Sequence, residues 1–216
     1  MDFFPIDMTL PQFIGYGSAM QDDERQNTAS DPSEPSEYPR PRRAPTVQEA
    51  KAVAHPLRVR ILRLCIAEEL TNKQLADRLG RDPGTVHYHV RQLLGAGLLH
   101  PAPVRTSDSG ALEKPYRATA TTWWLDNPFA AAGRGAALAP VEAFADELSE
   151  AGPDAVQTLA RFTLHLSPED VRALDRRILA ILDEYVETDD QRRDQPAHGG
   201  IVVVHRLANS ETRDPS

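Results

Sequence analysis

The sequence of 216 residues contains a single cysteine, Cys65. One cysteine by itself can form neither an intrachain disulfide nor a thiolate metal site. No apolar run reaches the roughly 18 residues that would indicate a membrane-spanning helix. The first residues also lack the basic start of a signal peptide. These absences predict a cytoplasmic protein that has no membrane partner.

The chain as a whole also lacks an excess of positive charge, because its formal net charge is -8. The charge is nevertheless unevenly distributed. Residues 46–120 carry 11 basic and 7 acidic side chains, whereas residues 1–45 carry 4 and 8, and residues 121–216 carry 9 and 17. One basic segment between two acidic ones is compatible with a modular nucleic-acid binder.

The composition of residues 21–45 indicates a linker, because prolines and charged side chains cannot bury enough apolar surface to offset the entropy of ordering. Residues 1–20 are more apolar, and they are either a docking segment or a variable tail. We therefore predict a disordered acidic, proline-rich tail over residues 1–45 and a second disordered tail over residues 211–216.

Three helical segments with short joints follow. A short helix over residues 47–53 precedes the first of them, which begins near Pro56 and places its apolar side chains on one face at the spacing of a helix. The second segment covers residues 71–80. Thr71 and Gln74 have the spacing of a capping box, and Gly80 is a favourable helix stop.

The third segment covers residues 82–94, where Asp82 is a good N-cap and Pro83 occupies the first helical position. We expect Val86, Val90, Leu93 and Leu94 to face inward, and His89 to be a half-buried packing residue on the same side. The joint from the second segment is only residues 80–82. Two short helices with a tight glycine-bearing joint predict a helix-turn-helix.

The residues after this helix predict a β-hairpin. Residues 98–100 have the pattern of a short strand, residues 101–111 that of a loop, and residues 114–120 that of a returning strand in which Pro115 suits an edge. A hairpin directly after the second helix of a helix-turn-helix is a wing. The predicted fold class is therefore mainly α with some β, a winged helix-turn-helix over residues 46–120.

Four stretches of this segment, AHPLRVRIL (54–62), LADRL (75–79), TVHYHVRQL (85–93) and AGLL (96–99), together resemble the bacterial winged helix-turn-helix regulators of the ArsR-like group. The resemblance implies a homodimer that binds a roughly palindromic operator in double-stranded DNA, usually as a transcriptional repressor. Metal sensors of this group carry a Cys-x-Cys motif on the helix before the recognition helix. Residues 73–79 contain no cysteine, so that metal site is excluded and no cofactor is expected.

We expect the third helix, at about residues 83–95, to lie in the major groove of DNA. Its outward side chains Thr85, His87, Tyr88 and Arg91 would contact bases or backbone, and Gly84 would let the helix backbone approach closely. Phosphate contacts are expected from Thr71, Lys73 and Arg81, and from Arg105 and Lys114 in the wing. A zinc site formed by His87 and His89 is disfavoured, since residues two apart on a helix do not face each other.

Residues 121–210 are predicted to form a small helical or α+β domain for dimerisation, with a small-molecule effector as an open possibility. The expected helices cover residues 139–151, 154–161 and a long segment from Ser167, and the expected strands cover residues 121–125, 162–166 and 201–207. In the long helix, Val171, Leu174, Ile178, Ile181 and Tyr185 form an apolar stripe that is either a dimer seam or an inner face. Trp123 and Trp124 either line an effector pocket or pack in a core or interface.

Two further functions remain at this stage. Some winged helices bind proteins rather than DNA, but the basic balance of residues 46–120 favours DNA. An enzyme is not expected, because residues 121–216 contain no nucleophile–base pair, metal-ligand spacing or phosphate-binding loop.

Overall fold

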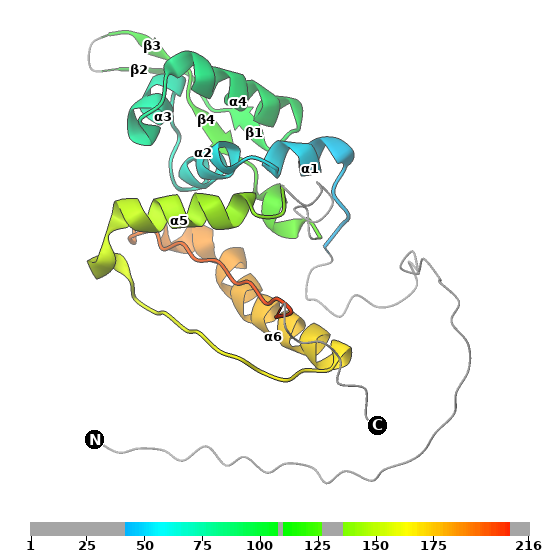
Figure 1. Cartoon of the computed structure of the whole chain (residues 1–216). Helices are drawn as coiled ribbons and strands as arrows, with labels where there is room; N and C mark the ends of the chain where they lie inside the picture. The colour runs from blue at the N-terminus through cyan, green and yellow to red at the C-terminus, as the bar shows by residue number, and fades with distance from the viewer. Residues whose placement is uncertain (1–41, 108–109, 127–135, 208–216) are drawn as a thin grey trace, which may run out of the picture. The chain divides into compact units, whose positions relative to one another are not determined.

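The computed structural model describes residues 42–107, 110–126 and 136–207 (Figure 1). By their contacts, the described residues belong to one compact unit. The predicted disordered tails and the docking segment at residues 1–20 lie outside the described residues, apart from the last few residues of the first tail.

Four α-helices form the first half: α1 Val47–Val53, α2 Pro56–Ala67, α3 Asn72–Leu79 and α4 Pro83–Gly95 (Figure 1). Each begins at a residue whose side chain accepts a backbone hydrogen bond, and these residues are Thr46, His55, Thr71 and Asp82. Such a side chain satisfies one of the backbone N–H groups that a helix leaves unpaired at its start. The predicted start of α2 and the predicted boundaries of α3 and α4 are confirmed to within a residue or two.

The hairpin after α4 is longer than predicted. Strand β1 Leu99–Pro101 pairs antiparallel with β4 Tyr116–Ala118, and Leu99 lies opposite Ala118. The segment predicted as a loop, residues 101–111, contains β2 Arg105–Thr106, which pairs with β3 Leu112–Glu113. The prediction missed this outer ladder because each of its strands has only two residues, too few to show an alternating pattern. The described part is thus an α+β winged helix-turn-helix followed by further helices.

One apolar core holds the winged helix together. Its members with no exposed surface come from α2, α3, α4 and the turn into β1, and they are Ile61, Cys65, Leu75, Val86, Val90, Leu93 and Leu98. Burial of each large aliphatic side chain contributes roughly 1.5–3 kcal/mol. The predicted inward residues of α4 are confirmed, although Leu94 is only half-buried.

The strand predicted at residues 121–125 is wrong. Residues Ala120–Trp124 form a 3₁₀ helix, η1. The backbone of Arg43 explains this outcome, because its N–H donates to the carbonyl of Trp124 at 3.0 Å and its carbonyl accepts from the N–H of Asp126 at 2.7 Å. The chain therefore turns back onto the segment that precedes α1 instead of extending the hairpin.

Helix α5, Ala139–Ala151, is confirmed and lies along α2 (Figure 1). Its Ala139 and Ala143 are buried. Arg60 of α2, whose side chain is 8% exposed, forms an ion pair with Glu150, and Arg63 forms one with Glu147. Burial raises the pKa of the Glu147 carboxyl in spite of the nearby arginine.

Helix α6, Pro168–Glu187, is also confirmed, and Ser167 and Asp170 form a capping box at its start. The short 3₁₀ helix η4, Asp189–Arg192, follows it. None of the described helices has the length and apolarity needed to cross a lipid bilayer.

Three further predictions for the C-terminal half are wrong. The helix expected at residues 154–161 is only a 3₁₀ turn, η3 Pro153–Ala155. The segments predicted as strands, residues 162–166 and 201–207, belong to the described residues but have no regular secondary structure. Their apolar patterns suit strands, but no neighbouring described strand pairs with them, and a strand needs such pairing to satisfy its backbone.

Candidate nucleic-acid interface

Helix α4 has one buried and one exposed side. Val86, His89, Val90 and Leu93 are buried. The side chains of Thr85, His87, Tyr88 and Arg91 are all exposed, and Tyr88 is 58% exposed in spite of its large ring. The expected outward row is therefore available on the surface, and its guanidinium, hydroxyl and imidazole groups can hydrogen bond with base edges.

The start of α4 is fixed by its cap. The Oδ2 atom of Asp82 accepts a hydrogen bond from the backbone N–H of Thr85 at 2.9 Å. A Cβ atom added at Gly84 would lie 2.9 Å from that same oxygen. The exposed glycine therefore makes room for the capping carboxylate, a role that the sequence reasoning missed, and it also keeps the backbone accessible as expected.

The joint between α3 and α4 is held by backbone and side-chain contacts. Gly80 adopts a left-handed conformation, with a φ of 58°, which residues with a Cβ rarely adopt. The Nδ2 atom of Asn72 donates to the carbonyl of Pro83 at 2.9 Å and so joins the starts of the two helices. Sequence reasoning missed Asn72, whose only signal was its place next to the cap. Lys73 in the first turn of α3 and Arg81 in the joint both have exposed side chains.

Thr71 is less available than predicted. Its hydroxyl oxygen accepts from the N–H of Gln74 at 3.2 Å as the cap of α3, and its side chain is half-buried. The hydroxyl proton can still donate to an acceptor outside the chain, because the cap uses only the oxygen.

The wing contacts the first helix of the helix-turn-helix. Arg105 of β2 donates from Nε to Glu113 of β3 at 2.9 Å, and its Nη2 lies 3.4 Å from Oε1 of Gln74. Because Asn72 joins α3 to α4, the wing and the starts of both helices form one continuous surface. Arg105 has part of its charge neutralised there by Glu113, whereas Lys114 is exposed.

His89 is confirmed as a packing residue, and it is only 7% exposed. Its ring centroid lies 4.5 Å from that of His55 and 5.3 Å from that of Tyr88. Burial, together with the nearby His55 and Arg58, lowers the pKa of His89 to about 4. The imidazole is therefore neutral near pH 7, and its packing helps to hold α4 against α2.

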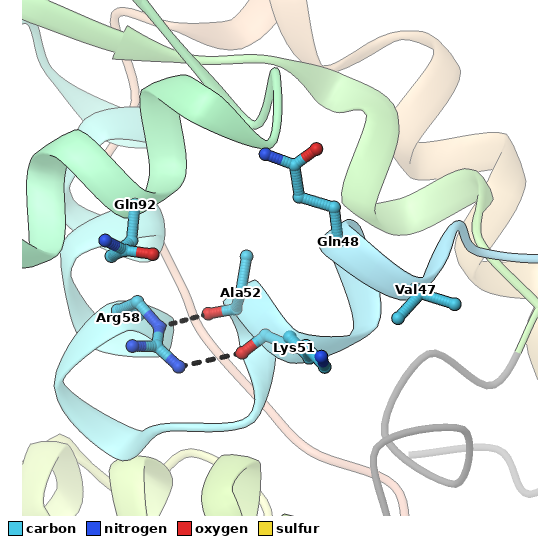
Figure 2. A pocket seen from close by; sticks show the side chains of 6 residues that line it. All are labelled: Val47, Gln48, Lys51, Ala52, Arg58 and Gln92. Carbon is cyan, nitrogen blue, oxygen red and sulfur yellow. Dashed lines mark hydrogen bonds between the residues drawn. The ribbon is translucent and has the colours of Figure 1, made fainter.

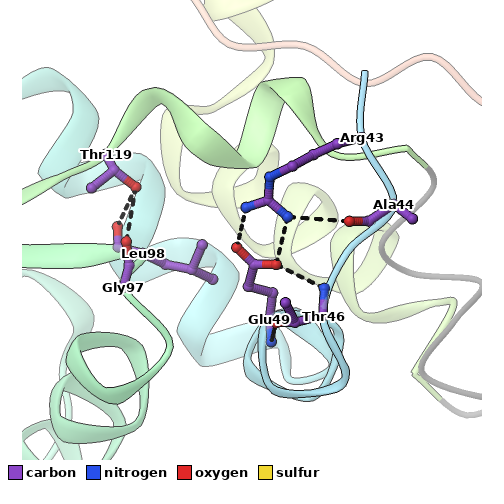
Figure 3. Close-up of polar contacts among 7 residues, drawn as sticks. All are labelled: Arg43, Ala44, Thr46, Glu49, Gly97, Leu98 and Thr119. Atoms are coloured by element: carbon purple, nitrogen blue, oxygen red, sulfur yellow. Dashed lines mark hydrogen bonds and ion pairs between the residues drawn. The ribbon is translucent and has the colours of Figure 1, made fainter. Parts of the chain in front are cut away.

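The end of α4 is held by α1, and the turn that follows it is held by Thr119, the residue after β4. The Nε2 atom of Gln48 donates to the carbonyl of Gly95 at 2.7 Å. Figure 3 shows the Thr119 hydroxyl beside the carbonyls of Gly97 and Leu98, each at 3.3 Å. Both ends of the helix that bears the exposed row are thus fixed to the domain.

Helix α1 is in turn fixed by a buried carboxylate. Glu49 is 6% exposed, closes the capping box with Thr46, and accepts from both terminal nitrogens of Arg43 (Figure 3). The hydrogen bonds from Arg43 are the main reason that the pKa of Glu49 is lowered to about 2. Sequence reasoning placed Arg43 in a disordered tail and missed this pair.

A groove of about 400 Å³ lies between α1, α2 and the second half of α4 (Figure 2). Its lining residues are Val47, Gln48, Lys51, Ala52, Arg58 and Gln92. The guanidinium of Arg58 is engaged there, because it donates to the carbonyls of Ala52 and Lys51 at the end of α1. Burial lowers its pKa. Neither Trp123 nor Trp124 lines this groove.

The two tryptophans pack around a buried charge pair instead. The Nε1 atom of Trp123 donates to Oδ1 of Asp183 in α6 at 2.7 Å, and Nη2 of Arg42 binds the same oxygen at 2.7 Å. The Arg42 guanidinium lies 5.5 Å from the Trp123 ring centroid and 5.7 Å from that of Trp124. This contact favours the packing interpretation of both rings.

Cys65 is buried, and burial raises the pKa of its thiol to about 12, so it is not a reactive thiolate. Within the described ranges, His, Cys, Asp and Glu side chains form no group of three that could hold a metal ion.

A protein-family model described as a helix-turn-helix domain matches residues 53–102, which is less than half of the chain. The matched range includes α2, α3, α4 and β1. No curated protein matches the chain significantly. The chain therefore contains a helix-turn-helix domain of the kind found in DNA-binding regulators, and the exposed row of α4 lies within it.

Proposed function

We propose that this protein is a sequence-specific transcriptional regulator of the ArsR-like type, which binds its operator through α4 and the wing. One observation carries the proposal: Thr85, His87, Tyr88 and Arg91 are exposed together on a helix whose opposite side is buried in the core. A helix fixed in this way can present the same side chains to every operator copy.

In this mechanism the first turns of α4 enter the major groove. Arg91 donates in a bidentate manner to O6 and N7 of a guanine. Thr85 and Tyr88 hydrogen bond to base edges or contact a thymine methyl group, and His87 donates to an acceptor on either strand.

Contacts with phosphates position the protein without reading sequence. They come from Lys73 in α3, from Arg81 in the joint, from the Thr71 hydroxyl, and from Arg105 and Lys114 in the wing. Because the chain carries a net charge of -8, attraction to DNA is confined to this basic part and other faces are repelled. The protein would act as a homodimer, with two copies of α4 one helical turn of DNA apart, and would repress by occupying a promoter.

The test begins with selection of bound sequences from random double-stranded DNA by the purified full chain. Arg91→Ala should then lower affinity for the selected site about tenfold or more, since one bidentate base contact contributes about 1–3 kcal/mol. Arg172→Ala, which removes an exposed arginine from α6, is the matched control and should leave affinity unchanged. Equal affinities for the two variants would remove Arg91 from the interface.

Salt dependence separates DNA binding from a protein-interaction role. Contact with several phosphates releases counterions, so log Kd should rise linearly with log salt concentration. The protein-interaction role would be favoured instead if the chain selected no sequence and did not bind DNA even at low salt.

A further inference from the structure

Helix α6 presents an apolar stripe that the described part of the chain leaves partly exposed. Leu174, Ile178, Ile181 and Tyr185 follow at intervals of four, three and four residues, so they share one side of the helix. Ile181 is 59% exposed and Tyr185 is 64% exposed, while Leu174 and Ile178 are half-buried. A regular stripe of this kind, left open on a helix, marks a surface for another helix.

The opposite side of α6 is the one fixed to the chain. Asp183 is 1% exposed and binds Arg42 and Trp123. With 3.6 residues per turn, Ile181 and Tyr185 lie two positions to either side of Asp183 and therefore face away from it. The stripe thus points away from the contact that holds the helix, and Arg192 lies beside its Tyr185 ring at 5.7 Å.

Two charges beside the stripe indicate what covers it. Arg177 and Glu184 lie along the same flank, both are exposed, and neither forms an ion pair with another described residue. They are seven residues apart, about 10 Å along the helix axis, which is too far for a pair within one helix. If α6 of a second copy lies antiparallel to this one, each of these charges comes beside the opposite charge of the other copy.

We propose that the stripe of α6 binds the same stripe of a second copy of the chain, with the two helices antiparallel. The two-fold axis then brings Arg177 of each subunit beside the partner's Glu184, so that two ion pairs form. It also places Ile178 against the partner's Ile181, and Leu174 against the partner's Tyr185. This arrangement deepens the proposed function, because it is the contact that would join two DNA-reading domains.

A parallel pairing is disfavoured by the same side chains. It would bring Asp170 of each helix close to the partner's Asp175 and would leave Arg177 without an acid opposite it. Charge therefore selects the antiparallel orientation, while the apolar stripe supplies the attraction.

The segments before and after α6 also expose apolar side chains that an interface could cover. After α5, large apolar side chains are exposed in both segments that flank α6, and they include Leu159, Phe162, Leu164, Val202, Val203 and Leu207. A second copy would remove part of this apolar surface from water.

The test is a charge exchange in the full chain, followed by sedimentation equilibrium. Arg177→Glu and Glu184→Arg each place like charges together twice, and each should raise the dimer dissociation constant about tenfold. The double variant R177E/E184R restores both pairs with reversed sign, and should return the constant to about the wild-type value.

Matched controls use the same charge changes on exposed positions of α6 that lie off the stripe. Arg172→Glu and Glu187→Arg should leave the dimer unchanged. A wild-type chain that is monomeric at all concentrations would overturn the proposal. So would single variants that dimerise like the controls, or a double variant that is no better than the single ones.

Failure of this interface and failure of DNA recognition have different signatures. If only the interface is wrong, the charge variants keep wild-type affinity and stoichiometry on the selected operator. If only DNA recognition is wrong, no DNA is bound, yet the charge exchange still controls dimerisation.

Discussion

Acidification below pH 6.5 should destabilise the winged helix through His89. The ring is buried between α4 and α2, beside His55 and Tyr88, with Arg58 close enough to disfavour a second positive charge. Its Nδ1 atom has no hydrogen-bond partner among the described residues. A proton added to this ring would therefore leave a buried charge without an acid to pair with it.

The magnitude follows from the lowered pKa. The unfolded chain binds a proton at His89 below its ordinary pKa of about 6.5, whereas the folded chain does so only near pH 4. Stability from this group is thus complete above pH 6.5 and is lost as the pH falls toward 4. At 1.36 kcal/mol per pKa unit, the loss amounts to at most about 3 kcal/mol.

Urea unfolding followed by circular dichroism, repeated from pH 7.5 to 4, measures this loss. His89→Gln cannot titrate, so the difference between its stability profile and that of the wild type isolates the histidine from the carboxylates. His87→Gln, on the exposed side of the same helix, is the matched control and should keep the wild-type profile. A wild-type profile parallel to that of His89→Gln would refute the reasoning.

Two more predictions concern the buried charge pairs. Glu49→Gln should lower the free energy of unfolding by about 1–3 kcal/mol in urea at pH 7, because it removes the charged acceptor of Arg43. The variant should also lose the wild-type decline in stability below pH 4.5, since the folded pKa of Glu49 is about 2. Asp183→Ala removes the acceptor shared by Arg42 and Trp123, and should cost about 3 kcal/mol in the same assay. A cost below 1 kcal/mol would show that the pair does not anchor α6.

The helix-turn-helix was predictable because its signals are local. Thr71 with Gln74, and Asp82 with Pro83, mark helix starts by contacts within one turn. The apolar spacing of α4 fixes which side is buried, and the exposed side follows by geometry. The exposure of Thr85, His87, Tyr88 and Arg91 could therefore be predicted, whereas their contacts with DNA remain proposals.

The structure of the C-terminal half was predicted less well because it depends on contacts with residues that are distant in the sequence. Residues 162–166 alternate as a strand does, yet a strand exists only where another pairs with it. Nothing in the sequence separates Asp183 from the other acids of α6, and only its contact with Arg42, 141 residues earlier, makes it the buried anchor of the helix.

By itself, the sequence determined the starts of the helices in the helix-turn-helix, the joint, the presence of a wing and the outward row of α4, because each depends on residues close together in the sequence. The tertiary structure alone decided which side of α6 is buried, that Glu49 pairs with Arg43, and that Asn72 and Arg105 join α3 to α4 and the wing. These contacts depend on which distant side chains come within hydrogen-bond distance, and no local pattern encodes that distance.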